Sequence, residues 1–190
     1  MTILRWIDFD PEAQAQALKS IREIFFESSE RKSFNSDSDR ESFWNKWVQY
    51  YFDEFPEEIF LATHSLEIVG YLTGCRFSNE AQLQISENIP YFSLFSNYFD
   101  HYPAHLHVNV KAQFRGHGIG EFLISSYCQY LSENSVVGVH LLTSPGARNV
   151  NFYRRCGFDF EAELPWKSTK LLFMGKKISD ERERTNFLEP

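Results

Sequence analysis

The stretch that decides the fold is "QFRGHGIGEFLISSYCQYL", Gln113 to Leu131. Three glycines, Gly116, Gly118 and Gly120, stand at alternate positions in it, between a strand-like run and a helix-like run. Glycines so placed let successive backbone N–H groups point into one concavity, where the positive end of a helix dipole also favours an anion. The stretch therefore predicts a turn that holds a pyrophosphate, with a purely structural strand-to-helix connection as the alternative.

Known phosphate-binding fingerprints narrow the interpretation of this turn. A dinucleotide-binding turn needs GxGxxG, but Glu121 stands where its last glycine is required, and the GK[ST] of a P-loop is absent. The pattern that fits is Gln113-x-x-Gly116-x-Gly118, after a strand and at the start of a helix. Basic side chains at Lys111, Arg115 and His117 make this place locally positive in an acidic chain.

A second motif follows the turn. The run "NVNFYRRCGFDF" places Tyr153 four residues before Gly157, with Phe158 completing "FYRRCGF". Together with "VNVKAQFRGHGIGEFL", it closely resembles the Gcn5-related N-acetyltransferase (GNAT) family, and the order of elements agrees over nearly the whole chain. The segment "YPAHLHVNV" most resembles the corresponding segment of acetyltransferases similar to the domain attached to some O-GlcNAc hydrolases.

The resemblance implies an α/β (α+β) fold. Its central sheet is mixed, mostly antiparallel and twisted, with about seven strands flanked by helices and a splay between strands 4 and 5. The splay leaves backbone groups free for the pantetheine amides of acetyl-CoA, and the glycine turn donates N–H groups to the pyrophosphate. The residues expected at acetyl-CoA are Val108, Asn109, Val110, Gln113, Arg115, Gly116, His117, Gly118, Ile119, Gly120 and Asn149.

The implied chemistry is direct acyl transfer from acetyl-CoA to a primary amine in a ternary complex. Tyr153 stands where the family often has a general acid that protonates the departing thiolate, and a buried helical aromatic is the alternative. The amine must also lose a proton, and His107 is the best candidate base. The alternative for His107 is a structural hydrogen-bonding histidine. The family often has Asn seven residues before the tyrosine, where Gly146 stands here, with Asn149 nearby.

Strand alternation separates two sets of side chains before the turn. His105, His107 and Asn109 lie on one face, whereas Leu106, Val108 and Val110 lie on the other, which is the natural core face. Related sequences carry a carboxylate near Asn109, and an amide cannot accept a proton at neutral pH. Two histidines without further ligands do not make a metal site, so no metal is expected.

The composition and charge of the chain limit which partners and locations are expected. The net charge of -7 disfavours nucleic acid, and acidic runs such as "DEFPEE" mildly favour a cationic substrate. No secretory signal and no membrane-spanning run are visible, so a cytoplasmic location and no membrane partner are expected. The three cysteines Cys75, Cys128 and Cys156 have neither disulfide nor zinc spacing. The expected partners are acetyl-CoA and an amine acceptor, with the protein a monomer or homodimer.

The predicted organisation is one domain over residues 1–178 and a charged tail, 179–190. A helix should run from Pro11 to Ser28 behind an Asp10 cap, and Ser38 with Glu41 announces a second helix. A hairpin joined at His64 and Ser65 should follow. Residues 76–103 are an aromatic insertion expected to form a short helix or an ordered loop, either a lid or extra packing.

The later elements alternate between strands and helices. After the strand at "HLHVNV" and a helix from about 118 to 133, the chain should form the strand "VGVHLLTS", a helix near 148–156 and two final strands. In the second helix, Phe43, Trp47, Tyr50 and Tyr51 share a stripe that either packs in the core or lines the substrate site.

Two other function classes stay open at this point. The protein could bind acyl-CoA as a non-catalytic sensor, or it could be an interaction module that docks through its aromatic insertion. If it is an enzyme, its acceptor could be a small amine, an aminoglycoside, a peptide N-terminus or a protein lysine.

Overall fold

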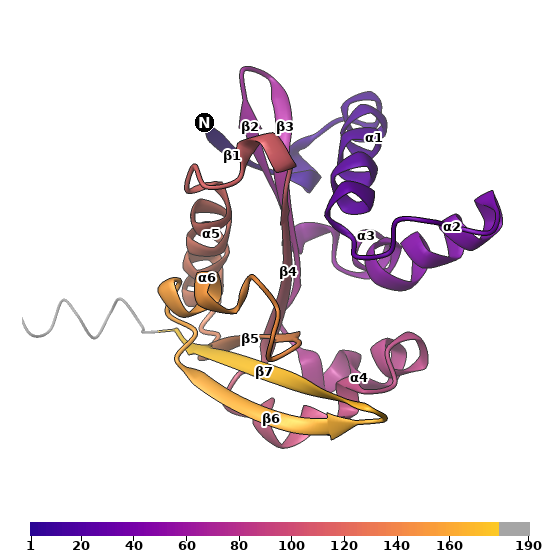
Figure 1. Cartoon of the computed structure of the whole chain (residues 1–190). Coiled ribbons are helices and arrows are strands. Elements are labelled where there is room, and N and C mark those ends of the chain that lie inside the picture. Colours follow the sequence, from indigo (N-terminus) through magenta and orange to yellow (C-terminus); the bar gives the residue numbers. More distant parts are fainter. Residues whose placement is uncertain (179–190) are drawn as a thin grey trace, which may run out of the picture. The chain divides into compact units, whose positions relative to one another are not determined.

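The computed structural model describes residues 1–178, whose seven strands form one mixed sheet in the order β1-β2-β3-β4-β5-β7-β6 (Figure 1). The strands are β1 (Thr2–Arg5), β2 (Ile59–His64), β3 (Glu67–Cys75), β4 (Ala104–Val110), β5 (Gly138–Thr143), β6 (Phe160–Trp166) and β7 (Thr169–Lys177). β4 and β5 run parallel, and their register joins Ala104 with Val139 and His105 with His140 but no later pair among residues 1–178. The predicted fold class is confirmed, whereas the predicted tail lies outside the described residues.

The helices are α1 (Pro11–Ser28), α2 (Asp37–Trp44), α3 (Tyr50–Glu54), α4 (Ser78–Asn88), α5 (Ile119–Glu133) and α6 (Val150–Arg155). The chain divides into two compact units that interleave in sequence. The first unit contains residues 1–74 and 107–127, and the second contains residues 75–106 and the described residues from Cys128 onward. The single domain over residues 1–178 stays a prediction.

In the first unit, α1, α2 and α3 lie on one face of β2 and β3, and α5 lies on the other (Figure 1). The core on the first face is formed by Ile21, Ile24, Trp44, Val48, Ile59 and Leu61. The start of α1 is as predicted, because Asp10 accepts a hydrogen bond from the Ala13 N–H at 2.8 Å and Pro11 is the first helical residue.

The second helix begins earlier than predicted. Its cap is Ser36, whose Oγ accepts from the Asp39 N–H at 3.1 Å, so Ser38 lies inside α2. The reason is a contact that spacing alone cannot show. The Asp39 carboxylate pairs with Arg31 and accepts from the Asn35 N–H at 3.0 Å, which fixes the chain one residue before Ser36.

The hairpin turn is also displaced by one residue. His64 still pairs with Glu67, and the turn residues are Ser65 and Leu66, with φ of 50° and 68°. Two successive left-handed residues match the twist of antiparallel strands, which explains why the two-residue turn forms here.

A π-helical turn, Asn45–Gln49, joins α2 to α3 and changes which side chains face the core. The buried residues are Trp44, Val48 and Tyr51, at 0%, 3% and 3% exposure, whereas Phe43 and Trp47 are only partly buried. Of the predicted stripe, Tyr51 is therefore fully buried, whereas Phe43 and Trp47 are only partly buried against the core, since the extra residue of a π turn shifts the helical phase.

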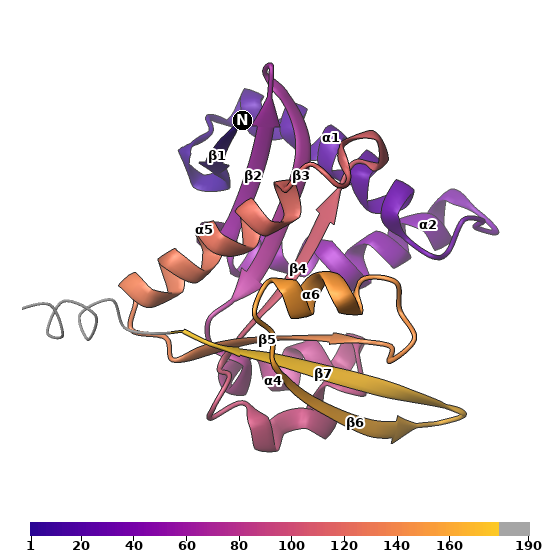
Figure 2. The same cartoon turned by 60° about the vertical axis from the view of Figure 1, so that its left-hand side comes forward.

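In the second unit, α4 lies on one face of β5 and β7 and α6 on the other (Figure 2). A 3-10 helix at Phe92–Tyr98 follows α4, so the predicted short helix within residues 76–103 is confirmed. Aromatic side chains of this helix and of the residue after it are core: Phe95 stacks on Phe173 with ring centroids 5.6 Å apart, and Phe99 stacks on His140 with centroids 4.9 Å apart.

The first half of β4 is buried on both of its faces. His105 is 3% exposed and Leu106 is 1% exposed, whereas Val108 and Val110 are half-buried. The prediction that one face of this strand is core and the other is not is therefore wrong. The aromatic segment of the second unit covers His105, whose Nδ1 lies 2.8 Å from Ser78 Oγ and whose ring packs on Phe92.

Within residues 1–178, no helix is both long and apolar enough to cross a bilayer.

Candidate active site

The glycine turn has the backbone that an anion site needs. Gly116 and Gly118 have φ of +80° and +77°, and a Cβ at either would meet no atom within 4 Å, so their conformation rather than crowding requires glycine. Helix α5 begins at the next residue, Ile119, and its first intrahelical bond runs from the Phe122 N–H to Gly118 O at 2.9 Å. Within residues 1–178, the N–H groups of Gly116, His117 and Gly118 donate no hydrogen bond. They are available to a bound anion.

Contacts with α1 hold the turn in this shape. The guanidinium of Arg115 donates from Nε to Val110 O at 2.9 Å and from Nη2 to Ser28 Oγ at 3.0 Å. The Ala112 N–H donates to Glu27 Oε2 at 2.9 Å, and the Arg115 N–H donates to Ala112 O at 3.2 Å. Of the residues predicted at the cofactor, Arg115 and the Val110 carbonyl therefore brace the turn.

The other predicted residues of the turn lie at its surface or anchor it. Gln113 and His117 are exposed, and His117 Nδ1 lies 3.0 Å from Arg115 O. Ile119 is 4% exposed and extends its side chain toward Gly70 of β3. The positive charge of Lys111 is paired with Glu67, so the turn is less basic than its sequence indicates.

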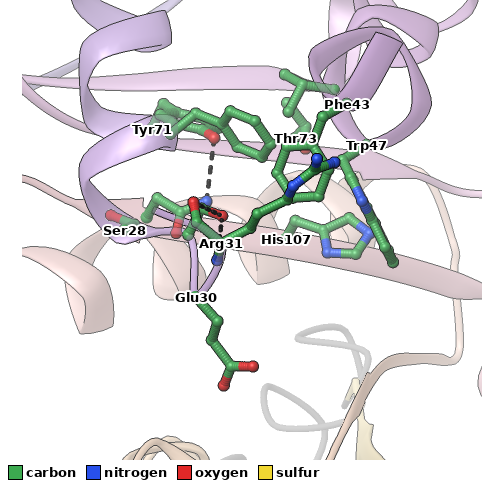
Figure 3. A pocket seen from close by; sticks show the side chains of 12 residues that line it. Ser28, Glu30, Arg31, Phe43, Trp47, Tyr71, Thr73 and His107 are labelled. Atoms are coloured by element: carbon green, nitrogen blue, oxygen red, sulfur yellow. Dashed lines mark hydrogen bonds between the residues drawn. The ribbon is translucent and has the colours of Figure 1, made fainter. Parts of the chain in front are cut away.

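A cavity of about 390 Å³ opens in the same unit (Figure 3). It is built by the end of α1 and the residues after it, by α2 and the π turn, and by β3 and β4. Its lining is Phe25, Ser28, Ser29, Glu30, Arg31, Phe43, Trp47, Val48, Tyr71, Thr73, His107 and Asn109. The structure thus brings His107 and Asn109 together, and Ser28 is shared with the brace of the turn.

His107 lies in the cavity wall in a low-polarity setting. Its ring makes an edge contact with Tyr51, with centroids 5.5 Å apart. Burial lowers the pKa of His107 from 6.5 to about 4, because desolvation penalises the charged imidazolium. The imidazole is therefore neutral at neutral pH and has a lone pair that can accept a proton.

Asn109 forms a hydrogen bond with the Tyr71 hydroxyl, a second buried polar group in the cavity wall. Its Nδ2 donates to the Tyr71 hydroxyl at 3.0 Å. Burial raises the pKa of Tyr71, and the hydrogen bond from Asn109 acts in the opposite direction. The Asn109 amide is thus part of a neutral pair.

Two tryptophans three residues apart differ in their indole N–H groups. Trp44 Nε1 donates to Gln49 Oε1 at 2.8 Å. Trp47 Nε1 is buried and makes no hydrogen bond within residues 1–178, and Trp47 lines the cavity. Sequence reasoning placed Phe43 and Trp47 in a possible substrate wall but missed Arg31 and Thr73, which no motif marks.

Tyr153 and Asn149 belong to the second unit, where α6 carries them. Tyr153 is 7% exposed and makes an edge contact with Phe158, with ring centroids 5.7 Å apart. Burial raises the pKa of Tyr153, Cys156 raises it further, and a hydrogen bond from the Asn149 side chain opposes the shift. The structure therefore brings these two predicted residues together and keeps the phenol protonated.

Several solved structures are similar to this chain over most of its length. The crystal structure of SsHAT is 17% identical, with a TM-score of 0.71, and the match covers 94% of this chain and 98% of that one. A Drosophila melanogaster polyamine N-acetyltransferase is 13% identical, with a TM-score of 0.63 and coverages of 93% and 99%. Chaetomium thermophilum Naa20, in complex with a bisubstrate analogue, is 18% identical, with a TM-score of 0.59 and coverages of 97% and 90%. At such identities the likeness shows the fold alone.

A comparison with curated proteins found no match. A family model, described as the acetyltransferase (GNAT) family, matches residues 18–158, which include the glycine turn and the "FYRRCGF" run. This match covers well over half of the chain. The chain therefore belongs to the acetyltransferase (GNAT) family of enzymes.

Proposed function

We propose that this protein transfers an acetyl group from acetyl-CoA to a primary amine by direct attack in a ternary complex. The observation that carries the proposal is the glycine turn: Gly116 and Gly118 are left-handed, and three consecutive N–H groups there have no partner within residues 1–178, at the start of a 15-residue helix. Backbone donors at the positive end of a helix dipole suit a pyrophosphate. Acetyl-CoA is the donor that the family uses.

The cofactor would lie along β4 and the turn. The N–H groups of Gly116 to Gly120 would bind the pyrophosphate, with Gln113 and His117 at its edge. The backbone of Val108 and Asn109 would bind the pantetheine amides, because no β4 residue after His105 is paired with β5 within residues 1–178. Asn149 would complete the set by orienting Tyr153.

The acceptor amine would enter the cavity and attack the thioester carbonyl. A C–N bond forms, the C–S bond breaks, and the proton of the amine passes to His107, whose ring is neutral at neutral pH but is a weaker base than a free imidazole because burial lowers its pKa. The Tyr153 hydroxyl would donate to the departing sulfur. Since burial raises the pKa of Tyr153, a strong hydrogen bond to the thiolate serves better than complete proton transfer.

A specific observation favours a second candidate, the acyl-CoA sensor. Asn109 pairs with Tyr71 in place of a carboxylate, and Gly146 occupies the position of the family's frequent Asn. The experiment is acetyl-CoA binding by calorimetry beside thiol release with a panel of primary amines. Binding with amine-dependent thiol release is expected for the enzyme. Tight binding without thiol release for every amine would favour the sensor, and no binding would favour an interaction module.

Four further predictions remain proposals. They are a cytoplasmic location, a monomer or homodimer, the absence of nucleic-acid or membrane partners, and the finer likeness to the acetyltransferase-like domain of O-GlcNAc hydrolases. Sedimentation of the purified chain with and without acetyl-CoA tests the assembly state directly.

A further inference from the structure

The last turn of α1 does not stabilise its own end. It contains no basic residue, and Glu27 adds a carboxylate at the end of the helix where the dipole is already negative. Ser28 is the final helical residue, and the Ser29 N–H closes the helix by donating to Phe25 O at 2.9 Å. The end of α1 therefore depends on groups from another part of the chain.

The segment just before the two left-handed glycines supplies these groups. The Ala112 N–H donates to Glu27 Oε2 at 2.9 Å, and Arg115 Nη2 donates to Ser28 Oγ at 3.0 Å. The Arg115 guanidinium thus brings a cation to the negative end of α1, which is the favourable sign of charge there. The end of α1 and the glycine turn hold each other in place.

The same end of α1 begins one wall of the cavity. The lining includes four consecutive residues, Ser28, Ser29, Glu30 and Arg31 (Figure 3). The Ser29 hydroxyl acts within this wall, because it accepts from the Arg31 N–H at 3.1 Å. The Ser28 hydroxyl instead links the wall to Arg115. Since the three residues after Ser28 lie outside the helix, their position depends on where the end of α1 is held.

A ligand on the turn would act on this link. Arg115 directly precedes the three N–H groups that are available to an anion, and His117 Nδ1 lies 3.0 Å from Arg115 O. A ligand that binds one arrangement of a segment raises the population of that arrangement. A pyrophosphate on the turn therefore favours the contact between Arg115 and Ser28, and with it one position of the wall.

We propose that Ser28 is a positioning residue that links the two substrate sites: through Arg115, the turn that binds acetyl-CoA also fixes the cavity wall, so the acceptor binds more tightly when acetyl-CoA is bound. The proposal rests on the proposed function, because it assigns the turn to the donor and the cavity to the acceptor. By thermodynamic linkage, the acceptor must raise the affinity for acetyl-CoA by the same factor.

The test measures this coupling by calorimetry. Phenethylamine is the acceptor probe, since one ring and one ammonium suit a mainly apolar lining, and CoA without an acetyl group fills the donor site so that no turnover occurs. In the wild type, CoA should lower the Kd of phenethylamine about tenfold, within the range typical of coupled sites. In Ser28→Ala, which removes the hydroxyl that Arg115 contacts, this factor should fall below about threefold.

Ser29→Ala is the matched control, because it removes the neighbouring hydroxyl of the same wall, which bonds to Arg31 and not to Arg115. Its coupling factor should stay at the wild-type value even where its affinity for phenethylamine changes. Ser28→Thr keeps a hydroxyl and should keep the coupling. An unchanged coupling factor in Ser28→Ala, or an equal loss in Ser29→Ala, would overturn the inference.

Hydrogen exchange at the amides of residues 29–36 repeats the test without an acceptor. Acetyl-CoA should slow this exchange in the wild type and have little effect on it in Ser28→Ala. If no amine is acetylated but this difference is found, the proposed function fails and the link through Ser28 stands. If amines are acetylated and acetyl-CoA affects residues 29–36 equally in both proteins, the link fails and the proposed function stands.

Discussion

Two aromatic segments of this chain, residues 43–51 and 92–102, look alike in sequence and differ in the structure. In the first, Phe43 and Trp47 line a cavity, and the Trp47 N–H has no hydrogen bond within residues 1–178. In the second, Phe92, Phe95, Phe99 and Tyr102 are all less than 8% exposed and pack on one another and on β7.

The difference lies in burial. The rings of the second segment are enclosed by one another and by β7, whereas Phe43 and Trp47 are only partly buried and border a cavity. Rings that are packed on all sides contribute to stability, whereas rings that border a cavity can contact a ligand. Substitutions of Phe43 or Trp47 should therefore impair binding, and those in the second segment should impair folding.

The largest effect is expected at the glycine turn. Gly118→Asp should abolish measurable acetyl-CoA binding, because a carboxylate beside the free N–H groups repels the pyrophosphate and competes for them. Calorimetry measures the affinity. Gly118→Asn is the matched control, since Asn has nearly the same size and tolerates the φ of +77° at this position. It should bind far better than Gly118→Asp, and equal affinity in the two variants would show that charge is not the cause.

Substitutions in the aromatic segment, residues 92–102, should lower the stability of the protein. Phe95→Ala removes a fully buried ring stacked on Phe173 and should cost about 3–5 kcal/mol of unfolding free energy. Urea denaturation measures it, with Phe122→Ala as a control because Phe122 is 39% exposed. The KM for the acceptor should not change at temperatures where the variant is folded. A raised KM with wild-type stability would instead support a lid role for residues 76–103.

Tyr153 combines the two behaviours, because it is packed like a core residue but assigned to chemistry. Tyr153→Phe keeps the ring contacts with Phe158 and removes only the hydroxyl. The turnover number should fall between about tenfold and a thousandfold, while stability and the KM for acetyl-CoA change little. Full turnover across the pH range would leave Tyr153 with a packing role only.

The smallest effect is expected from the titration of His107. Its pKa of about 4 lies below the unfolded value of about 6.5, so the unfolded state binds the proton more readily. The contribution of the neutral ring to stability is complete above pH 6.5 and is lost as the pH falls to about 4. It amounts to no more than about 3 kcal/mol.

The His107→Gln variant should lose this part of the pH dependence of stability, as measured by denaturation at several pH values. If His107 is the base, the acid limb of kcat/KM in the wild type should also lie near pH 4. An acid limb near pH 6.5 would place the imidazole in contact with water rather than in a desolvated wall.

Some outcomes could be predicted because they depend on neighbours in the chain. The Asp10 cap and the Pro11 start of α1 need only contacts three residues apart, and the glycine turn needs only backbone conformations that glycine favours. The same reasoning failed at Ser38, because the choice between Ser36 and Ser38 depends on the pairing of Arg31 with Asp39.

The sequence by itself determined the family, the order of elements and the backbone conformation of the glycine turn, since each depends on local spacing. Only the tertiary structure decided which aromatic rings are core and which line the cavity, because a π turn moves the phase of one segment and β7 covers the other. It also decided the charge state of His107, whose pKa falls to about 4 because residues distant in the sequence remove it from water. Burial depends on contacts between segments that are distant in the sequence, and the local spacing of residues does not predict those contacts.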